Sequence, residues 1–177
     1  MNIMKITDQK QLNLIYEMRY KVFFEPEKDA PKSLYPDGLV KTEVDDQAIH
    51  LGCFEGETLL GFLSIVLKAT TGHLPIEKQF GIVSEENSAE IMFLLIIDEN
   101  IKGKAPSKKG EILKSLLVAT SKILESNNTS FIYLISIKSS QRIYEKIGFS
   151  KIGDYELYEN FSWQCPMKLD PNDVRLI

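Results

Sequence analysis

The chain has 177 residues, 44% of them hydrophobic and 26% charged, a size and composition that predict a globular protein with a substantial core. Its net charge of −4 and pI near 5.3 argue against a nucleic-acid-binding surface, which normally carries a basic excess. Because no apolar run approaches the roughly 18 residues of a membrane span and no N-terminal segment resembles a signal peptide, we expect a cytoplasmic protein without membrane contacts.

The first half of the chain predicts a strand, a helix, a long loop and a hairpin. Asp8 and Gln11 form a capping-box pattern at the start of the helix. In chain order these elements are a strand at 2–7, a helix with Leu12, Ile15, Met18 and Val22 on its apolar face, a loop at 25–47 that contains Pro26, Pro31 and Pro36, and strands at 48–54 and 59–68 joined by a turn at 55–58. A loop of this length in a compact domain is often functional.

The second half predicts a central strand followed by alternating helices and strands. Residues 90–97 are nearly all apolar, as in a strand that is covered on both faces. The remaining elements are a short helix at 76–80, a helix at 110–126, a strand at 131–137, a helix at 140–147 and strands near 149–158 and 162–169. We therefore expect an α/β (α+β) fold in one domain, 1–177, with a mixed, mostly antiparallel sheet of about seven strands flanked by helices.

A hexapeptide near the end of the helix at 140–147 links this order to a known superfamily. Tyr144-Glu145-Lys146-Ile147-Gly148-Phe149 resembles the Y-E-K-x-G-F signature of GCN5-related N-acetyltransferases, and Gly148 can terminate the helix. The predicted element order matches that fold from end to end. In the superfamily this tyrosine stands near the thioester sulfur of acetyl-coenzyme A. The resemblance therefore implies acyl transfer, with acetyl-CoA or another acyl thioester as co-substrate.

The N-terminal third resembles one branch of the same superfamily. Arg19-Tyr20-Lys21-Val22-Phe23-Phe24-Glu25, followed by Glu43-Val44-Asp45-Asp46 and His50, is similar to a pattern in acyl-homoserine lactone synthases and N-acyl amino acid synthases. We expect Asp45 and Asp46 either to line an amine pocket or to form a solvated acidic turn. We expect His50 to be half-buried against the sheet.

The resemblance also implies roles for individual residues. The backbone amides of Leu95, Ile96 and Ile97 would polarise the acyl carbonyl. Tyr144 would protonate the departing sulfur, or alternatively be a packed tyrosine with a wet hydroxyl. Glu90 would take the amine proton through water, or alternatively be an ordinary strand-edge carboxylate.

Serine and lysine residues are the remaining candidates for donor binding. Ser139 and Ser140 would bind the cofactor arm, or alternatively cap the helix. In the superfamily, the loop before the long helix holds the pyrophosphate of coenzyme A, and the residues at this place are Lys102, Gly103, Lys104, Lys108, Lys109 and Gly110. The glycines of the family loop are largely missing and Glu111 would repel phosphate, so a solvated lysine loop is the alternative. Cys53 and Cys165 lack metal-ligand spacing and no metal is expected.

These observations predict an N-acetyltransferase that acts by direct transfer from acetyl-CoA to a primary amine of a small molecule. Two alternatives stay open: an N-acyltransferase that takes long acyl chains from acyl carrier protein or acyl-CoA, and a catalytically silent binding module. The expected partners are accordingly a small amine and, in the first alternative, acyl carrier protein, with no nucleic acid. A homodimer is an open alternative for the assembly.

Overall fold

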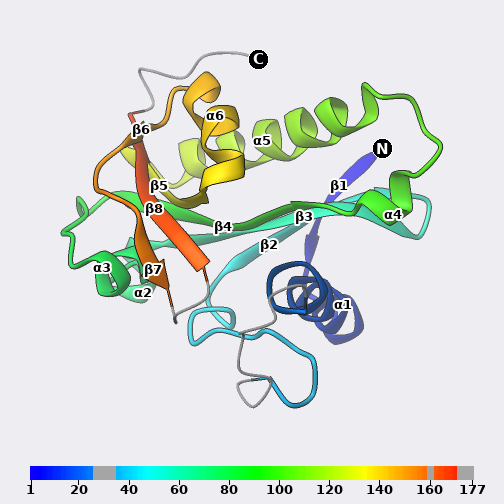
Figure 1. Ribbon diagram of the computed structural model, residues 1–177, viewed down its shortest axis with the longest axis horizontal. Helices are drawn as coiled ribbons and strands as arrows, with labels where there is room; N and C mark the ends of the chain where they lie inside the picture. The colour runs from blue at the N-terminus through cyan, green and yellow to red at the C-terminus, as the bar shows by residue number, and fades with distance from the viewer. Residues whose placement is uncertain (26–34, 159–161, 171–177) are drawn as a thin grey trace.

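The computed structural model describes residues 1–25, 35–158 and 162–170, and Figure 1 shows their arrangement. The elements in chain order are β1 (Asn2–Ile6), α1 (Gln9–Arg19), the π-helix η1 (Tyr20–Phe24), β2 (Ile49–Glu55), β3 (Thr58–Leu67), α2 (Lys68–Thr71), α3 (Pro75–Phe80), β4 (Ser88–Ile96), α4 (Asp98–Ile101), α5 (Lys108–Ser126), β5 (Phe131–Ile137), α6 (Lys138–Ile147), β6 (Ser150–Lys151), β7 (Glu156–Tyr158) and β8 (Ser162–Leu169). In this part of the chain, no helix is long and apolar enough to cross a membrane.

The strands form one eight-stranded sheet in the order β1-β2-β3-β4-β5-β8-β6, with β7 also paired to β8. Among the described strands, β4 and β5 pair in parallel and the other pairs are antiparallel. The predicted mixed, mostly antiparallel sheet flanked by helices is therefore confirmed. The expected strand at 149–158 is two short strands, β6 and β7.

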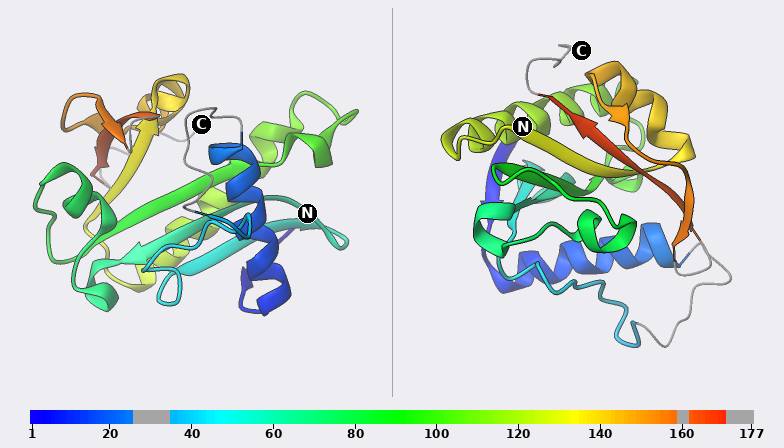
Figure 2. Two further views of the ribbon diagram at one scale, coloured as in Figure 1. Left: turned by 60° about the horizontal axis from the view of Figure 1, so that its bottom comes forward. Right: turned by 90° about the vertical axis from the view of Figure 1, so that its left-hand side faces the viewer.

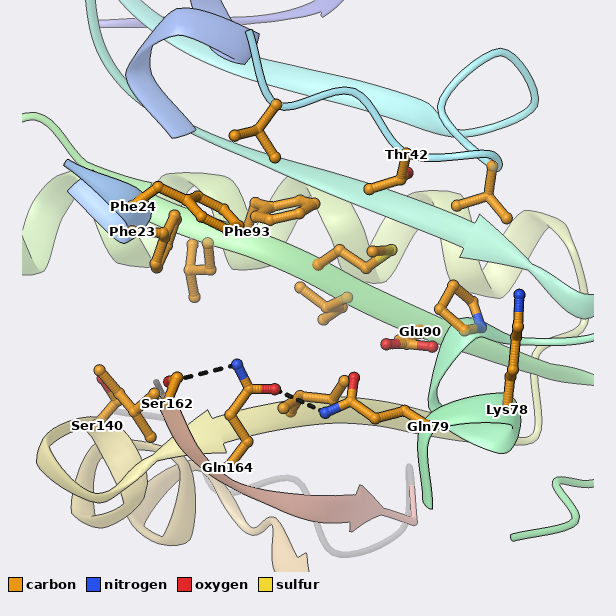
Figure 3. A pocket seen from close by; sticks show the side chains of 18 of the residues that line it. Phe23, Phe24, Thr42, Lys78, Gln79, Glu90, Phe93, Ser140, Ser162 and Gln164 are labelled. Carbon is orange, nitrogen blue, oxygen red and sulfur yellow. Dashed lines mark hydrogen bonds between the residues drawn. The ribbon is translucent and has the colours of Figure 1, made fainter. Parts of the chain in front are cut away.

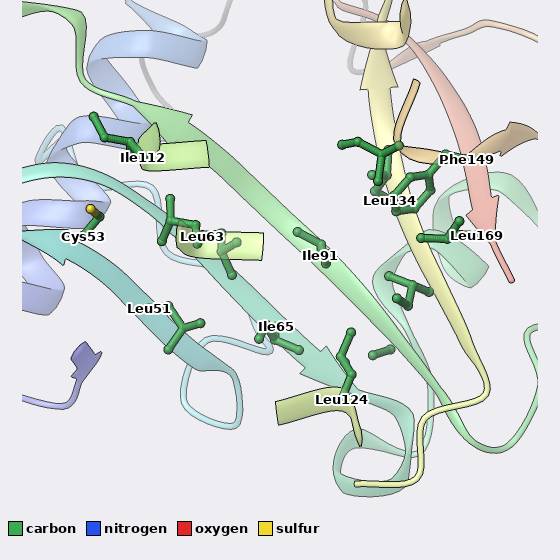
Figure 4. Packing of buried hydrophobic residues seen from close by; sticks show 14 of the residues in the cluster. Leu51, Cys53, Leu63, Ile65, Ile91, Ile112, Leu124, Leu134, Phe149 and Leu169 are labelled. Carbon is green, nitrogen blue, oxygen red and sulfur yellow. The ribbon is translucent and has the colours of Figure 1, made fainter. Parts of the chain in front are cut away.

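Helices cover both faces of this sheet (Figures 1 and 2). On one face, Ile112, Leu116 and Leu124 of α5 are buried against strand residues such as Leu63 and Ile91, as Figure 4 shows for this cluster. On the other face, α1 packs on β1–β3 in one cluster and α3 packs on β3 and β5 in another. Helices α1 and α5 each present one apolar stripe to the sheet, as the periodicity of the sequence predicts.

The ends of most elements lie within two residues of the predicted ones, and the exceptions have local causes. Asp8 caps α1 by accepting hydrogen bonds from the amides of Lys10 and Gln11. The helix expected to reach Val22 instead changes at Tyr20 into a π-helix, a rare form that is frequent at functional sites. The short helices α2 and α4 are not predicted, and the loop prolines 26 and 31 lie outside the described residues.

Two irregularities of β4 open the sheet at its centre. Strand β4 pairs with β5 only from Ser88 to Ile91, after which the two strands diverge, as Figure 4 shows. On the β3 side, the register shifts between Phe62 and Ser64, and Phe93 of β4 has a φ of 52°. An extra residue in one strand is a β-bulge, which bends the strand and increases its twist. The bulge therefore lies where β4 leaves β5.

Candidate active site

A cleft of about 740 Å³ lies where β4 and β5 diverge. Figure 3 shows its two ends: Phe23, Phe24 and Phe93 gather at one, whereas Glu90, Lys78 and Gln79 lie at the other. The residues that line the cleft also include Tyr35, Val40, Lys41, Thr42, Glu43, Val44, Pro75, Ile91, Met92, Leu94, Ile135, Ile137, Ser140, Tyr144, Glu156, Leu157, Ser162 and Gln164. The cleft thus has an aromatic end and a polar end.

Glu90 supplies a buried carboxyl group to the polar end. Only 1% of the residue is exposed, and its Oε2 accepts a hydrogen bond of 2.8 Å from the amide of Ile76. The pKa of Glu90 is raised to about 8, mainly by burial. The hydrogen bond from the Ile76 amide opposes this shift, and the charge of Glu77 adds to it. A carboxyl group with this pKa exchanges a proton near neutral pH. Glu90 occupies a central strand, so the strand-edge alternative is wrong.

The segment that carries Ile76 is held by a second carboxylate, Glu77. Its Oε2 accepts from the amide of Leu74 at 2.8 Å, and its Oε1 accepts from the amide of Ser84 at 2.9 Å and from the ammonium group of Lys68 at 3.0 Å. Burial raises the pKa of Glu77, but these donors lower it to about 2. Glu77 therefore stays ionised and fixes the first turn of α3, from which Ile76 reaches Glu90.

Tyr144 lines the cleft from α6 on the β5 side. Its ring is partly buried and packs edge-to-face on Phe149, with centroids 6.0 Å apart. Burial raises the pKa of Tyr144 to about 12, so the hydroxyl group stays protonated at physiological pH. Within the described part of the chain, this hydroxyl has no hydrogen-bond partner. It is thus a free donor beside the cleft.

Beyond its pairing with β5, strand β4 turns some of its backbone amides toward the gap. They are not the full set of Leu95, Ile96 and Ile97 that the sequence predicts. The amide of Ile97 donates to the carbonyl oxygen of Leu60 at 2.9 Å, on the β3 side. Successive amides of a strand point to opposite sides, so Leu95 also faces β3, while Leu94 and Ile96 face the gap. The prediction is therefore wrong for Leu95 and Ile97, because their amides already serve the β3–β4 ladder. Of the two others, Leu94 lines the cleft.

The two candidate serines are separated by their positions on α6. Ser140 lines the cleft, whereas Ser139 is exposed and does not. The helix begins after Ile137, and no side chain caps it. The alternative that these serines cap the helix is therefore wrong.

The acidic segment before β2 is neither part of an amine pocket nor a wholly solvated turn, because Asp45 is buried and Asp46 is exposed. Asp45 is 4% exposed and its Oδ2 lies 2.8 Å from Nη1 of Arg19. His50 is only 3% exposed and lies between Ser64 and the carbonyl of Asp45, so it is fully rather than half buried. Asp46 alone is solvated and pairs with Lys41. Neither aspartate lines the cleft, because the arginine draws Asp45 into the core.

The six candidates of the lysine loop lie outside the cleft. Lys102, Lys104 and Lys109 border a separate shallow depression of about 410 Å³ that also contains Asp98 and Glu99. Lys109 pairs with Asp98 at 2.8 Å, and Lys108 pairs with Glu55 at 3.0 Å. Lys104 also pairs with Glu55. Gly103 and Gly110 have open space around them. Three of the four lysines are thus already paired with two surface carboxylates, Glu55 and Asp98, as in a solvated loop.

Several cleft residues are not identified by the sequence. The π-helix places Phe23 and Phe24 at the cleft, where Phe23 packs on Phe93 with centroids 5.8 Å apart. Gln79 of α3 donates to Gln164 of β8 at 2.7 Å across the polar end (Figure 3). The paired phenylalanines, just beyond a predicted helix and before a long loop, were the one available signal. The glutamines carry none, because only the tertiary fold brings them together.

Comparison with solved structures identifies the fold. The N-acyl amino acid synthase FeeM from uncultured soil microbes matches with a TM-score of 0.69 and 14% identity over 97% of this chain and 91% of its own. The acyl-homoserine lactone synthase LasI matches with a TM-score of 0.71 and 12% identity over 99% of this chain and 98% of its own. The CoA-dependent acyl-homoserine lactone synthase BjaI, with SAM and isopentyl-CoA, matches with a TM-score of 0.67 and 16% identity over 94% of this chain and 78% of its own. No family model and no curated protein matches this chain. The fold is therefore GNAT-like, similar to the branch that the N-terminal residues resemble.

Proposed function

We propose that the protein, as one acyltransferase-like domain over residues 1–177, is an N-acyltransferase that moves an acyl group from a thioester to a primary amine of a small molecule. The observation that carries this proposal is the cleft between β4 and β5, which is lined by a strand edge beyond the β4–β5 pairing, a buried carboxyl group and a tyrosine hydroxyl that bonds to none of the described residues. The likeness to solved acyl-transferring synthases supports it.

The cleft suits the pantetheine arm of an acyl thioester. This arm contains two amide groups, which can bond to unpaired strand edges as a peptide strand does. Strands β4 and β5 provide such edges beyond Ile91 and Leu134, where their pairing ends. The same arm is present in coenzyme A and in acyl carrier protein, so the edges themselves accept either donor.

The residues of the cleft provide what the transfer needs. The amine nitrogen attacks the thioester carbonyl, a C–N bond forms and the C–S bond breaks. The Leu94 amide stabilises the negative charge that develops on the carbonyl oxygen. Glu90 takes the proton of the amine, through water, and Tyr144 gives its proton to the departing sulfur. A proton returned from Glu90 to Tyr144 through solvent completes the cycle.

The aromatic end favours an acyl chain longer than acetyl. Phe23, Phe24 and Phe93 surround a volume that an acetyl group would leave unfilled, whereas a medium or long chain would bury its methylene groups there. Each buried CH₂ group contributes about 0.8 kcal/mol. The solved synthases with similar folds include one with isopentyl-CoA. We therefore favour the longer-chain alternative over acetyl-CoA.

The polar end suits the acceptor amine. Glu90, Gln79 and Gln164 present carboxyl and amide oxygens that can accept hydrogen bonds from an amine, and Lys78 lies at the rim. An amino acid suits this end as an acceptor, because its amine can bond to these oxygens while its carboxylate contacts Lys78. FeeM is an N-acyl amino acid synthase with a similar fold, which supports this acceptor class.

A two-way panel tests the proposal. Acetyl-, hexanoyl- and decanoyl-CoA, together with decanoyl-acyl carrier protein, are each combined with the twenty amino acids and with simple amines. Released thiol and the acylated product are measured for the wild type and for Glu90→Gln. We expect decanoyl donors to exceed acetyl-CoA, with product lost in the variant. Donor binding without product for every pair would support the silent binding module instead, and the absence of donor binding would contradict the proposal.

A further inference from the structure

Arg19, at the end of α1, is a buried cation on the apolar face of the helix. The residue is 0% exposed, and its Nη1 donates to Asp45 Oδ2 at 2.8 Å and to the Val40 carbonyl at 3.2 Å. Its Nη2 donates to Ser64 Oγ at 2.7 Å. The guanidinium is therefore fixed by the 40–45 loop on one side and by β3 on the other.

His50 of β2 fixes the partners of this arginine. Its Nε2 donates to the Asp45 carbonyl at 3.0 Å, so its Nδ1 accepts from the Ser64 hydroxyl group at 2.8 Å. Burial lowers the pKa of His50, which keeps the ring neutral, as this pattern requires. Ser64 thus donates a hydrogen bond to His50 and accepts one from Arg19. The donor and acceptor role of each group in the cluster is therefore fixed.

The guanidinium group of Arg19 lies over the ring of Phe93. The Arg19 Cζ atom is 4.0 Å from the Phe93 ring centroid and 5.1 Å from that of Tyr16. Its Nε atom is buried and has no hydrogen-bond partner among the described residues. A buried donor without a hydrogen bond destabilises the fold. The side chain therefore keeps its position over the Phe93 ring at the expense of a hydrogen bond.

Phe93 has a backbone conformation that requires support. Its φ of 52° is in the left-handed region, which is strained for a non-glycine residue. Beyond the bulge, where Gly61 pairs with Ile96, the carbonyl of Leu95 comes so close to Gly61 that an added Cβ would lie 2.7 Å from the oxygen. The cation–π contact with Arg19 offsets part of this strain.

We propose that Arg19 is a positioning residue for acyl transfer: clamped by Asp45 and Ser64, it holds the Phe93 ring and thereby the β4 bulge that turns the Leu94 amide toward the acyl carbonyl. This inference rests on the proposed function. The buried cluster thus couples the N-terminal Arg–Asp–His pattern to the reaction without touching the substrate. A solely structural ion pair would stabilise the fold but would leave the rate per folded molecule unchanged.

A double-mutant cycle separates these roles. Arg19→Lys keeps a cation for Asp45 but loses the planar stack and the bond to Ser64, and we expect kcat to fall by about tenfold because the oxyanion donor is misplaced. Phe93→Gly adopts a positive φ without support. In the glycine background, Arg19→Lys should therefore change kcat by less than about twofold. Equal losses in both backgrounds would overturn the proposal, as would an unchanged kcat in Arg19→Lys.

Phe93→Leu provides a second test that leaves the buried ion pair intact. It removes the aromatic face over which the Arg19 guanidinium lies, and because Phe93 also lines the acyl end of the cleft, kcat is measured with acetyl-CoA as well as with decanoyl-CoA. We expect the same loss of kcat as in Arg19→Lys with both donors; an unchanged kcat would overturn the proposal. Lys21→Gln is the matched control, because Lys21 is an exposed cation on η1 that pairs with Glu17, and it should retain wild-type kcat.

A readout without turnover distinguishes this proposal from the proposed function. Backbone NMR of the free protein reports φ at Phe93 and the Leu94 amide resonance. In Arg19→Lys and Phe93→Leu we expect the positive φ to be lost and the Leu94 resonance to move. If this occurs in a protein that transfers no acyl group to any acceptor, the coupling stands and the proposed function fails. A retained φ with an unmoved resonance would overturn the coupling itself.

Discussion

The cleft between β4 and β5 and the lysine loop at 102–110 both match a donor-binding element of the resembling superfamily, but they differ physically. In the cleft, Glu90 is 1% exposed and its pKa is strongly shifted, and the Tyr144 hydroxyl is unbonded within the described residues. In the loop, Lys104, Lys108 and Lys109 are paired with nearby carboxylates. The comparison shows that an opening in the sheet is a better indicator of a binding site than a cluster of charges in the sequence.

The difference also predicts how strongly each region responds to mutation. A buried group interacts in a low dielectric, where a changed charge affects both pKa and stability. Exposed ion pairs contribute roughly 0–1 kcal/mol and weaken with salt. Changes in the cleft should therefore have large effects that depend on chemistry, whereas changes in the loop should have small effects that depend on ionic strength.

The largest effect is expected for Glu90→Gln. Loss of the general base should lower kcat/KM for the best donor and acceptor by about 10³-fold. In the wild type, kcat/KM should rise with pH and level off above about 8, because the ionised carboxylate is the base. Glu86→Gln is the matched control, since Glu86 is exposed outside the cleft. A variant with wild-type rates across the pH range would remove Glu90 from this role.

The stability of the protein should carry the same signature. The pKa of Glu90 is raised from 4.5 to about 8 in the folded state. Between these values the folded state holds a proton that the unfolded state has lost, so stability falls as pH rises, by on the order of 5 kcal/mol in total. Chemical denaturation from pH 5 to pH 9 measures this slope. Glu90→Gln should flatten it, and an equal slope in both proteins would contradict the burial of an ionisable group.

Tyr144→Phe should have the next largest effect. The ring still packs on Phe149, but the sulfur loses its proton donor, so kcat should fall by about 10²-fold with little change in the KM of the donor. Tyr155→Phe is the control, because the Tyr155 hydroxyl bonds to Gln141 outside the cleft. Equal rates for the two variants would reduce Tyr144 to a packed tyrosine.

The smallest effect is expected in the lysine loop. Replacing Lys104 and Lys108 by alanine should raise the KM of an acyl-CoA donor only severalfold at low salt, leave kcat unchanged and lose its effect near 1 M salt. Alanines at Lys114 and Lys122, exposed on α5, remove the same charge and provide the control. A loss of kcat/KM comparable to that of Glu90→Gln would place the main donor contact in the loop and reverse the comparison.

The sequence predicts this fold well because its signals are local and mutually consistent. Apolar periodicity and the Asp8 cap locate the helices, and the apolar run in β4 indicates a strand covered on both faces. Gly148 ends α6 at the expected place, with a φ of 120°. The π-helix is not predicted, because a helix of this kind is stabilised by tertiary packing rather than by residue propensity.

The candidate site is predicted only where the superfamily signature or a strand indicates it. Tyr144, Glu90 and Ser140 do line the cleft. The bulge at Phe93 is not predicted, although it determines which amides face the gap. One available signal was Arg19, a charge four residues after Ile15 on the apolar face of α1. A cation at such a position has to find a buried partner, and Asp45 is that partner.

The most direct measurement is a crystal structure with a non-hydrolysable thioether analogue of decanoyl-CoA. The account predicts that the pantetheine arm lies between β4 and β5, with the acyl oxygen within hydrogen-bond distance of the Leu94 amide and the sulfur beside the Tyr144 hydroxyl. Density for the analogue along the lysine loop alone, with the cleft closed by protein side chains, would contradict it.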